Sequence, residues 1–294
     1  DDIKTVGLQA KVGQGADGQG VGGTTGFITL TSGTISGTGA VDTAGGYRGA
    51  GGDVILTSTV GNITLDGAVN SNSGNTGSAT DSRRSAGNIT IDSAASVIAS
   101  AVMSANGGAA NGTQTGTSGN AGHIKITAVD DIKTVGLQAK VGQGADGQGI
   151  GGTKGSITLM ASTISGTGAI DTAGGYRGAG GNVMLTSHEG DTKIDGAVNA
   201  SGGANAGAGD ITINSAGSID VVSTVTANGG TNANAGDVTL VSGKAVKVGG
   251  DIAANGGAIS NGSGGFGGVI SITAHNAIET KSVSAQSVKL ATQP

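Results

Sequence analysis

Apolar residues alternate with polar ones after a glycine, and this pattern occurs nine times along the chain. Ile or Val stands two residues after the glycine, and Ile or Leu two residues further on, without exception. Alternate residues of a β-strand face the same side, so each pair predicts a short strand with one buried face. Strands that return inside a repeating unit predict a stack, which is a β-solenoid. The glycines are Gly26, Gly52, Gly87, Gly122, Gly155, Gly181, Gly209, Gly236 and Gly268.

Two further apolar positions follow in each unit and predict a second and a third strand. The second position is Ile35, Ile63, Val97, Ile132, Ile164, Ile194, Ile219, Val246 and Ile278. The third is Val41, Val69, Val102, Leu137, Ile170, Val198, Val225, Ile252 and Val283. A loop rich in Gly and Asn comes next, and differences in unit length fall there because loop closure entropy grows slowly with length. We therefore expect an all-β, right-handed parallel β-helix of about ten coils, each with three short strands.

The chain contains a long internal duplication. Residues 1–58 and 130–187 differ at only nine positions, and the offset equals four units. We expect one continuous solenoid over residues 1–294, with four coils in each of the blocks 1–129 and 130–258 and the remainder in 259–294. The chain begins with two aspartates rather than Met or a leader segment, so we expect a mature product or part of something longer.

Composition narrows the class of protein. The 62 glycines have no G-X-Y period, which excludes collagen, and the phased aliphatic residues argue against disorder. Aromatic residues are 1% of the chain and Cys is absent, so stability has to come from stacking. No stretch approaches the ~20 apolar residues that cross a bilayer, so no membrane insertion is expected. The net charge of −5 and the thinly spread Lys and Arg predict no nucleic-acid partner.

Candidate catalytic and metal-binding residues are sparse. His123, His188 and His275 lie in different units without Cys, which predicts no metal or other cofactor beyond adventitious calcium. Asp130 and Asp131 stand just before a strand, where a turn role is favoured. A glycosidase needs two carboxylates across a cleft, usually with an aromatic platform for the sugar. We therefore expect no enzymatic activity.

One loop motif, DTAGGYRGAGG, occurs at 42–52 and again at 171–181 and carries both tyrosines of the chain. Tyr and Arg are favoured anchors of binding surfaces, so a glycan or protein contact at this corner is one interpretation. The other is that Asp42 pairs with Arg48, and Asp171 with Arg177, to fix the loop. The candidate contact residues are Tyr47, Arg48, Tyr176, Arg177, Arg83 and Arg84.

Units such as GNITIDSAASVIASAVMSANGG (87–108) and GDITINSAGSIDVVSTVTANGG (209–230) resemble the repeats of filamentous-haemagglutinin-type exoproteins. Those are large bacterial surface proteins with right-handed parallel β-helix shafts. The resemblance covers essentially the whole chain, on glycines, alternating aliphatics and Asn-Gly turns. It implies an extracellular location at a bacterial surface and, by analogy, two-partner secretion. The family's secretion module with its Asn-Pro motifs has no counterpart here, and the repeats carry no site residues over to this chain.

The strands at the two ends of such a stack have unpaired edges, which normally pair with something. The segments around Ile3 and Ile278 have the same phase within a coil. We expect the structural shaft of an adhesin or fibre, whose partners are further coils or itself. Two alternatives stay open: head-to-tail self-assembly, and a glycan-binding or polysaccharide-processing β-helix. The expected end-to-end contact residues are Ile3, Val6, Leu8, Ile278, Val283 and Val288.

Overall fold

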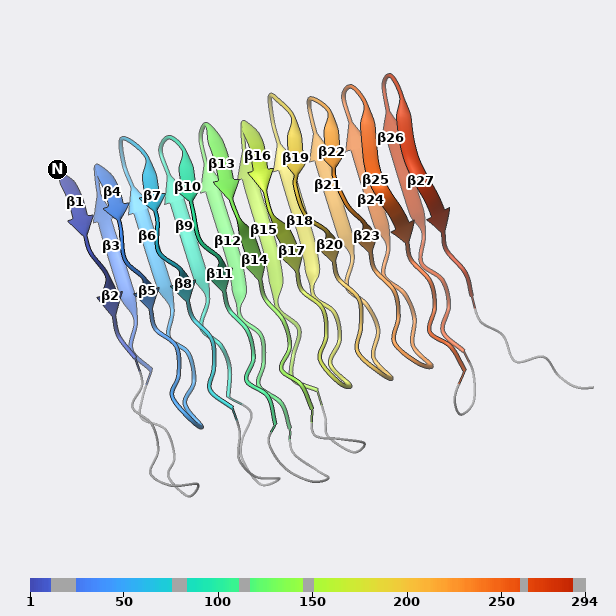
Figure 1. Ribbon diagram of the computed structural model, residues 1–294, viewed down its shortest axis with the longest axis horizontal. Coiled ribbons are helices and arrows are strands. Elements are labelled where there is room, and N and C mark those ends of the chain that lie inside the picture. The colour runs from blue at the N-terminus through green and yellow to red at the C-terminus, as the bar shows by residue number, and fades with distance from the viewer. Residues whose placement is uncertain (12–24, 76–83, 111–116, 145–150, 260–263, 288–294) are drawn as a thin grey trace, which may run out of the picture.

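A computed structural model describes residues 1–11, 25–75, 84–110, 117–144, 151–259 and 264–287. All regular elements among them are β-strands, and every strand pairing is parallel. The strands form one sheet of nine and one of eighteen strands, which run side by side along the length of the molecule (Figure 1). The chain is therefore an all-β, solenoid-like protein built from long parallel sheets, as the sequence pattern predicts.

The nine-stranded sheet collects the strands that follow the nine repeating glycines. Each of its strands is in register with the equivalent strand of the next unit. Ile89, Ile124 and Ile157 are direct partners in this way and are all fully buried. The predicted internal ladder of aliphatic side chains is confirmed. The strands are β3 (Ile28–Ser32), β6 (Val54–Ser58), β9 (Ile89–Ser93), β12 (His123–Ala128), β15 (Ser156–Ala161), β18 (Asn182–Ser187), β21 (Ile211–Ser215), β24 (Val238–Ser242) and β26 (Ile270–Ala274).

The eighteen-stranded sheet contains the second and third strands of the units. The second strands are β1 (Asp2–Thr5), β4 (Thr34–Gly37), β7 (Ile63–Leu65), β10 (Val97–Ala99), β13 (Asp131–Thr134), β16 (Thr163–Thr167), β19 (Thr192–Ile194) and β22 (Ile219–Val221). The third strands are β2 (Leu8–Gln9), β5 (Val41–Asp42), β8 (Val69–Asn70), β11 (Met103–Ser104), β14 (Gly136–Gln138), β17 (Ala169–Asp171), β20 (Val198–Asn199) and β23 (Val225–Thr226). In the last two units the two strands merge into β25 (Val246–Ala253) and β27 (Ile278–Ser284).

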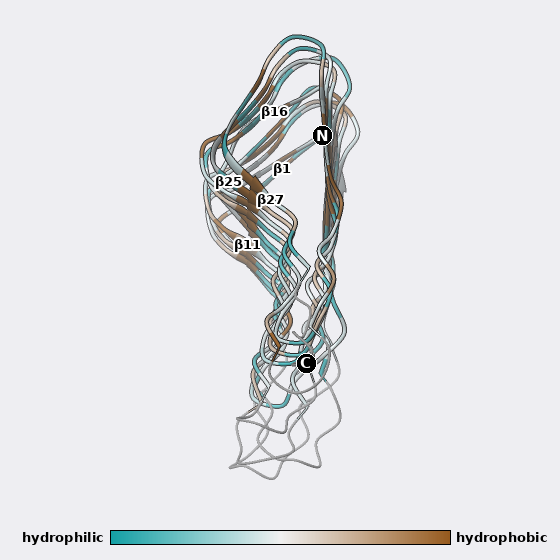
Figure 2. Ribbon diagram, turned by 90° about the vertical axis from the view of Figure 1, so that its right-hand side faces the viewer, coloured by the Kyte–Doolittle hydropathy of each residue, from teal (hydrophilic) through white to brown (hydrophobic). Residues whose placement is uncertain are grey.

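The core is a narrow interior between the two sheets. Seen along the stack, the chain closes around this interior on one side and continues into paired loop segments on the other (Figure 2). Ile, Val and Leu side chains from both sheets fill the interior. Because each unit adds one layer of such side chains, an interior unit is buried by the units on either side of it.

Buried serines fix the turn after the strands of the nine-stranded sheet. The hydroxyl of Ser58 donates to the carbonyl of Gly61 at 2.6 Å and lies 3.0 Å from the hydroxyl of Ser93. Buried polar groups of this kind are tolerated because their hydrogen bonds are made. The serines at this position that share the arrangement are Ser58, Ser93, Ser187, Ser215 and Ser242.

Two of the apolar residues assigned from the sequence are out of register with the adjacent units, although one of them, Ile194, is fully buried. Met103, rather than Val102, faces the interior of its unit and pairs with Leu137, while Val102 is exposed. Two adjacent apolar residues stand there, and the alternation of the strand buries only one of them. Thr192, rather than Ile194, is the partner of Ile164.

Candidate functional site

The two Tyr–Arg pairs of the repeated loop are stacked within their own loops. The guanidinium carbon of Arg48 lies 5.7 Å from the ring centroid of Tyr47, and that of Arg177 lies 5.8 Å from the ring of Tyr176. Both arginines have a left-handed backbone, with φ of 57° and 55°. Arg48 is buried and Tyr47 is half-buried. Each arginine therefore covers the face of its own tyrosine, as cation–π contacts do.

The structure does not bring the two pairs into one site. They lie four units apart, which is roughly 19 Å at the spacing of parallel strands. Arg84 is half-buried, and Arg83 lies outside the described residues. A glycan or protein contact that uses the whole predicted corner would have to span all of these units.

The expected ion pairs between Asp42 and Arg48, and between Asp171 and Arg177, are corrected by the structure. The carboxylate of Asp42 lies 2.7 Å from Nζ of Lys11, and that of Asp171 lies 3.2 Å from Nζ of Lys140. Each lysine belongs to the preceding unit. The ion pair therefore connects one unit to the next.

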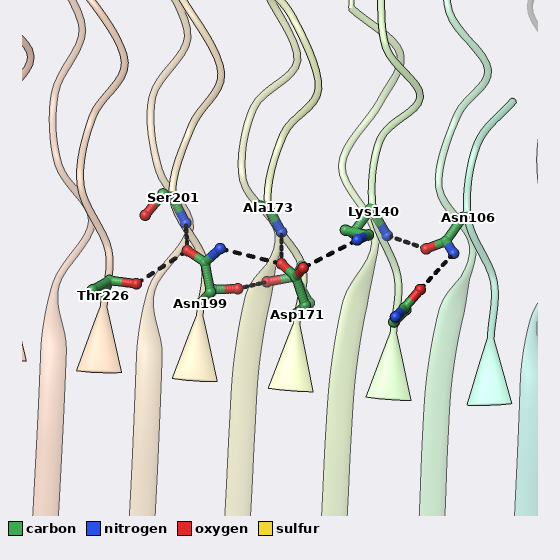
Figure 3. Close-up of polar contacts among 9 residues, drawn as sticks. Asn106, Lys140, Asp171, Ala173, Asn199, Ser201 and Thr226 are labelled. Carbon is green, nitrogen blue, oxygen red and sulfur yellow. Dashed lines mark hydrogen bonds and ion pairs between the residues drawn. The ribbon is translucent and has the colours of Figure 1, made fainter. Parts of the chain in front are cut away.

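The same two aspartates complete a ladder of side-chain to backbone hydrogen bonds, which Figure 3 shows around Asp171. One unit earlier, Oδ1 of Asn106 accepts from the backbone N–H of Lys140 at 2.9 Å. Lysine has no acceptor, so it cannot do the same for Ala173 in the following unit. Oδ1 of Asp171 instead accepts from the N–H of Ala173 at 3.0 Å. Lys140 thus stands where an asparagine would accept from the next unit, and Asp171 accepts that hydrogen bond in its place.

The next unit follows the same logic. Ala173 has no polar side chain, and the N–H of Ser201 donates to Oδ1 of Asn199 in its own unit at 3.1 Å. The Nδ2 group of Asn199 also donates to Oδ1 of Asp171 at 3.3 Å, and Thr226 donates to Asn199 at 3.1 Å. The backbone N–H groups of Lys140, Ala173 and Ser201, which hold this position in successive units, are therefore all paired, either by the preceding unit or by their own.

A second ladder runs along the residues that follow the repeating glycines. In each case a side-chain oxygen accepts from the backbone N–H of the next unit, toward the C-terminal end of the chain. The pairs are Asp53 with Asn88, Asn88 with His123, Asn182 with Asp210, Asp210 with Asp237 and Asp237 with Val269, at 2.7–3.1 Å. His123 and Ser156 interrupt the series and contact each other instead, with Nδ1 2.8 Å from Oγ.

Beside the first ladder lies a polar groove of about 520 Å³ that the sequence did not reveal. It crosses four consecutive units, from Asn75 to Gly175. Its charged residues are Lys140 and Asp171, and the side chains of Asn106 and Gln138 meet in it, with Nδ2 of Asn106 donating to Oε1 of Gln138 at 3.2 Å. The remaining lining residues are Gly107, Ala109, Val141, Gly142, Gln143, Ala173 and Gly174.

The strands β1 and β2, and the strand β27, lie at opposite ends of the stack (Figure 1), and they carry or flank the described residues expected at an end-to-end contact. At one end Val6 is 88% exposed and Ile3 and Leu8 are half-buried. At the other end Ile278 and Val283 are 48% and 50% exposed. Within the described residues β1 pairs only with β4, and β27 only with β25. Val288 lies outside the described residues.

No group of three or more metal-binding side chains occurs in the part of the chain that the structure describes. Asp131, one of the paired carboxylates, accepts hydrogen bonds from the hydroxyls of Thr163 and Ser165 in the next unit. The same part of the chain holds no helix that could cross a lipid bilayer. Comparison with models of known families, with curated proteins and with solved structures found no match.

Proposed function

We propose that the chain is a right-handed parallel β-helix that serves as the non-catalytic shaft of a bacterial extracellular adhesin or fibre. The observation that carries this proposal is the unbroken register of the nine-stranded sheet, from Ile28 to Ile270. Crossover connections between parallel strands are almost always right-handed, which supports the handedness. The extracellular bacterial location rests on the resemblance of the repeats to those of filamentous-haemagglutinin-type exoproteins.

Stiffness follows from the three kinds of ladder that join adjacent units. Aliphatic side chains stack inside, serine hydroxyls join the turns, and asparagine and aspartate side chains bind the backbone of the next unit. Bending the rod would have to stretch all of these contacts at one place. The mechanical role needs reach and stiffness, and neither requires a pocket or a catalytic residue.

Solution scattering and negative-stain microscopy test the shaft. A second copy of residues 1–129 inserted before Asp130 keeps the phase of the units, because Asp1 and Asp130 occupy equivalent positions. Four added units should lengthen the rod by about 19 Å without widening it. A Gly-Ser insert of the same length is the control, because it adds mass without strands. A particle that widens, or does not lengthen, would contradict the proposal.

A second candidate function, in the same structural class, is a filament subunit that stacks head to tail. Charges alternate along one row of the eighteen-stranded sheet through the strand partners Lys193, Asp220, Lys247 and Glu279. Lys4 has the equivalent position on β1. A second copy stacked in register would bring Lys4 beside Glu279 and Ile3 beside Ile278, which extends both the charge row and the apolar ladder.

Charge reversal tests this candidate. Lys4→Glu or Glu279→Lys alone should shorten the filaments seen over a concentration series, because each places like charges in adjacent strands. The double variant restores an opposite pair and should restore the filaments. Separate short rods of the parent chain at every concentration would contradict self-assembly and leave the shaft untouched.

A further inference from the structure

We propose that the polar groove between Asn75 and Gly175 binds a linear, neutral polysaccharide chain. This goes beyond the proposed shaft, because it assigns a ligand to one side of the stack. It also places the glycan contact beside the loop that carries Tyr176, at Asp171–Gly175, rather than at the Tyr–Arg pairs themselves. The first support is shape: the groove is open and crosses four units, about 14 Å of the stack. Its volume of about 520 Å³ lies in the range of ligand sites.

Glycines let the loops that form the groove pack closely on one another. A Cβ atom on Gly142 would lie 2.0 Å from the carbonyl oxygen of Gly108, and one on Gly175 would lie 2.2 Å from that of Gly142. These positions accept only glycine because the loops of successive units touch. Gly142 and Gly175 are buried between the loops, while the half-buried Gly107 and Gly174 bring backbone to the surface of the groove.

The walls keep hydrogen-bonding capacity that the protein does not use. Gln138 accepts from Asn106 through Oε1, while both protons of its Nε2 group have no partner among the described residues. Gln143 is exposed, and its side chain makes no hydrogen bond within the same part of the chain. The ammonium group of Lys140 contacts Asp171 with one of its three N–H groups, and the others remain available as donors. These unused groups belong to one unit, and the polar side chains of Asn106 and Asp171 flank them in the units before and after.

These groups suit sugar hydroxyls better than the other ligand classes. Asp171 neutralises Lys140, so an anion gains little from the groove. Val141 is buried, and the remaining apolar lining is Ala109 and Ala173, so no pocket takes a peptide side chain. A hydroxyl both donates and accepts, and matches amides, an ammonium group and a carboxylate at once. No aromatic ring lines the groove, so binding should be weak, on the order of millimolar.

The test is titration of the 294-residue chain with cellohexaose, xylohexaose, maltohexaose and chitohexaose, followed by calorimetry and saturation-transfer NMR. The variant Gln138→Ala/Gln143→Ala should weaken binding of the preferred hexasaccharide roughly tenfold, because two donors are lost. Gln9→Ala is the matched control: Gln9 is the duplicate of Gln138 in the first copy, outside the groove, and its loss should change nothing. Gln143→Ala alone removes no hydrogen bond within the described residues, so it reports binding if the double variant unfolds.

Three results would overturn the proposal. One is that no hexasaccharide binds up to its solubility limit. Another is that the parent and both groove variants bind equally, which would place the contact elsewhere. The third is that a Ser-, Thr- and Asn-rich dodecapeptide binds and the sugars do not. None of these affects the length of the rod, so failure here and failure of the shaft proposal are distinguishable.

Discussion

The two copies of the duplicated segment, residues 1–58 and 130–187, have nearly the same sequence and different surroundings. In the second copy Ile132, Leu137 and Ala139 are fully buried, because strands lie on both sides of them. In the first copy the same positions, among them Ile3 and Leu8, are only partly buried, since β1 and β2 have a partner on one side within the described residues. Whether a core residue is buried thus depends on the units on either side of it.

The comparison also shows one sequence in two backbone conformations. The segment TISGTGA occurs at 34–40 and at 163–169. In the first copy Gly37 pairs regularly with Leu65. In the second the register shifts, Gly166 takes a φ of 57°, and Thr167 becomes the buried partner of Ile194. We attribute the difference to the adjacent strand, because a leucine side chain reaches over a glycine and a β-branched isoleucine is stiffer.

The largest expected effect is on the inward isoleucine of the two copies. Ile132→Ala should lower the free energy of unfolding by about 3 kcal/mol, since it leaves a cavity between two adjacent units. Ile3→Ala removes the same atoms from a half-exposed site and should cost about 1 kcal/mol. Urea denaturation followed by circular dichroism measures both. Equal losses would mean that the adjacent units do not determine burial.

Glycine substitutions test the two conformations of TISGTGA. Gly166→Ala should cost about 1–2 kcal/mol, because a left-handed backbone disfavours a Cβ atom. The matched change Gly37→Ala should be neutral or stabilise by up to about 0.5 kcal/mol. Its Cβ would lie 3.5 Å from both Leu65 and Thr5, an ordinary contact. Denaturation midpoints compare the two variants, and a harmless Gly166→Ala would show that the second copy adopts the first conformation readily.

The parts that the sequence predicted are those that depend on alternation within one strand. The ladder of Ile89, Ile124 and Ile157 needs only that pattern. Thr192 was not predicted to be buried because its side chain carries a hydroxyl. That hydroxyl lies 2.9 Å from the hydroxyl of Ser187, and its burial depends on this contact. The lysine partner of Asp171 and the polar groove were missed for another reason: both join loop residues of different units, whose register the sequence leaves open.

The two copies should respond alike to changes in the polar ladder that contains Asp42 and Asp171. Asp171→Ala leaves the N–H of Ala173 without its acceptor and Lys140 without its partner, so it should cost about 1 kcal/mol. Adding Lys140→Asn should recover most of this loss, because Asn106 already binds the next unit in that way. Asp42→Ala with Lys11→Asn repeats the test in the first copy. Hydrogen exchange at the Ala173 amide reports the rung directly. If the double variant is no more stable than Asp171→Ala, an asparagine at position 140 does not replace the hydrogen bond that Asp171 makes.

The smallest effect is expected where the copies differ in sequence on the outer face. Phe27 is 73% exposed, and its counterpart Ser156 lies on the same outward position beside His123. Phe27→Ser should change the free energy of unfolding by less than about 0.5 kcal/mol, because an exposed side chain away from special contacts matters little. Ser156→Phe also removes the contact of the half-buried hydroxyl with His123 and should cost about 0.5–1 kcal/mol. Thermal melts of the two variants decide it. A large change at either position would mean that side chains on the outer face of the nine-stranded sheet contribute to stability. The two copies would then differ more in what stabilises them than their sequence identity indicates. Small changes would leave the inner ladders and the polar rungs as the contacts that hold both copies in the stack.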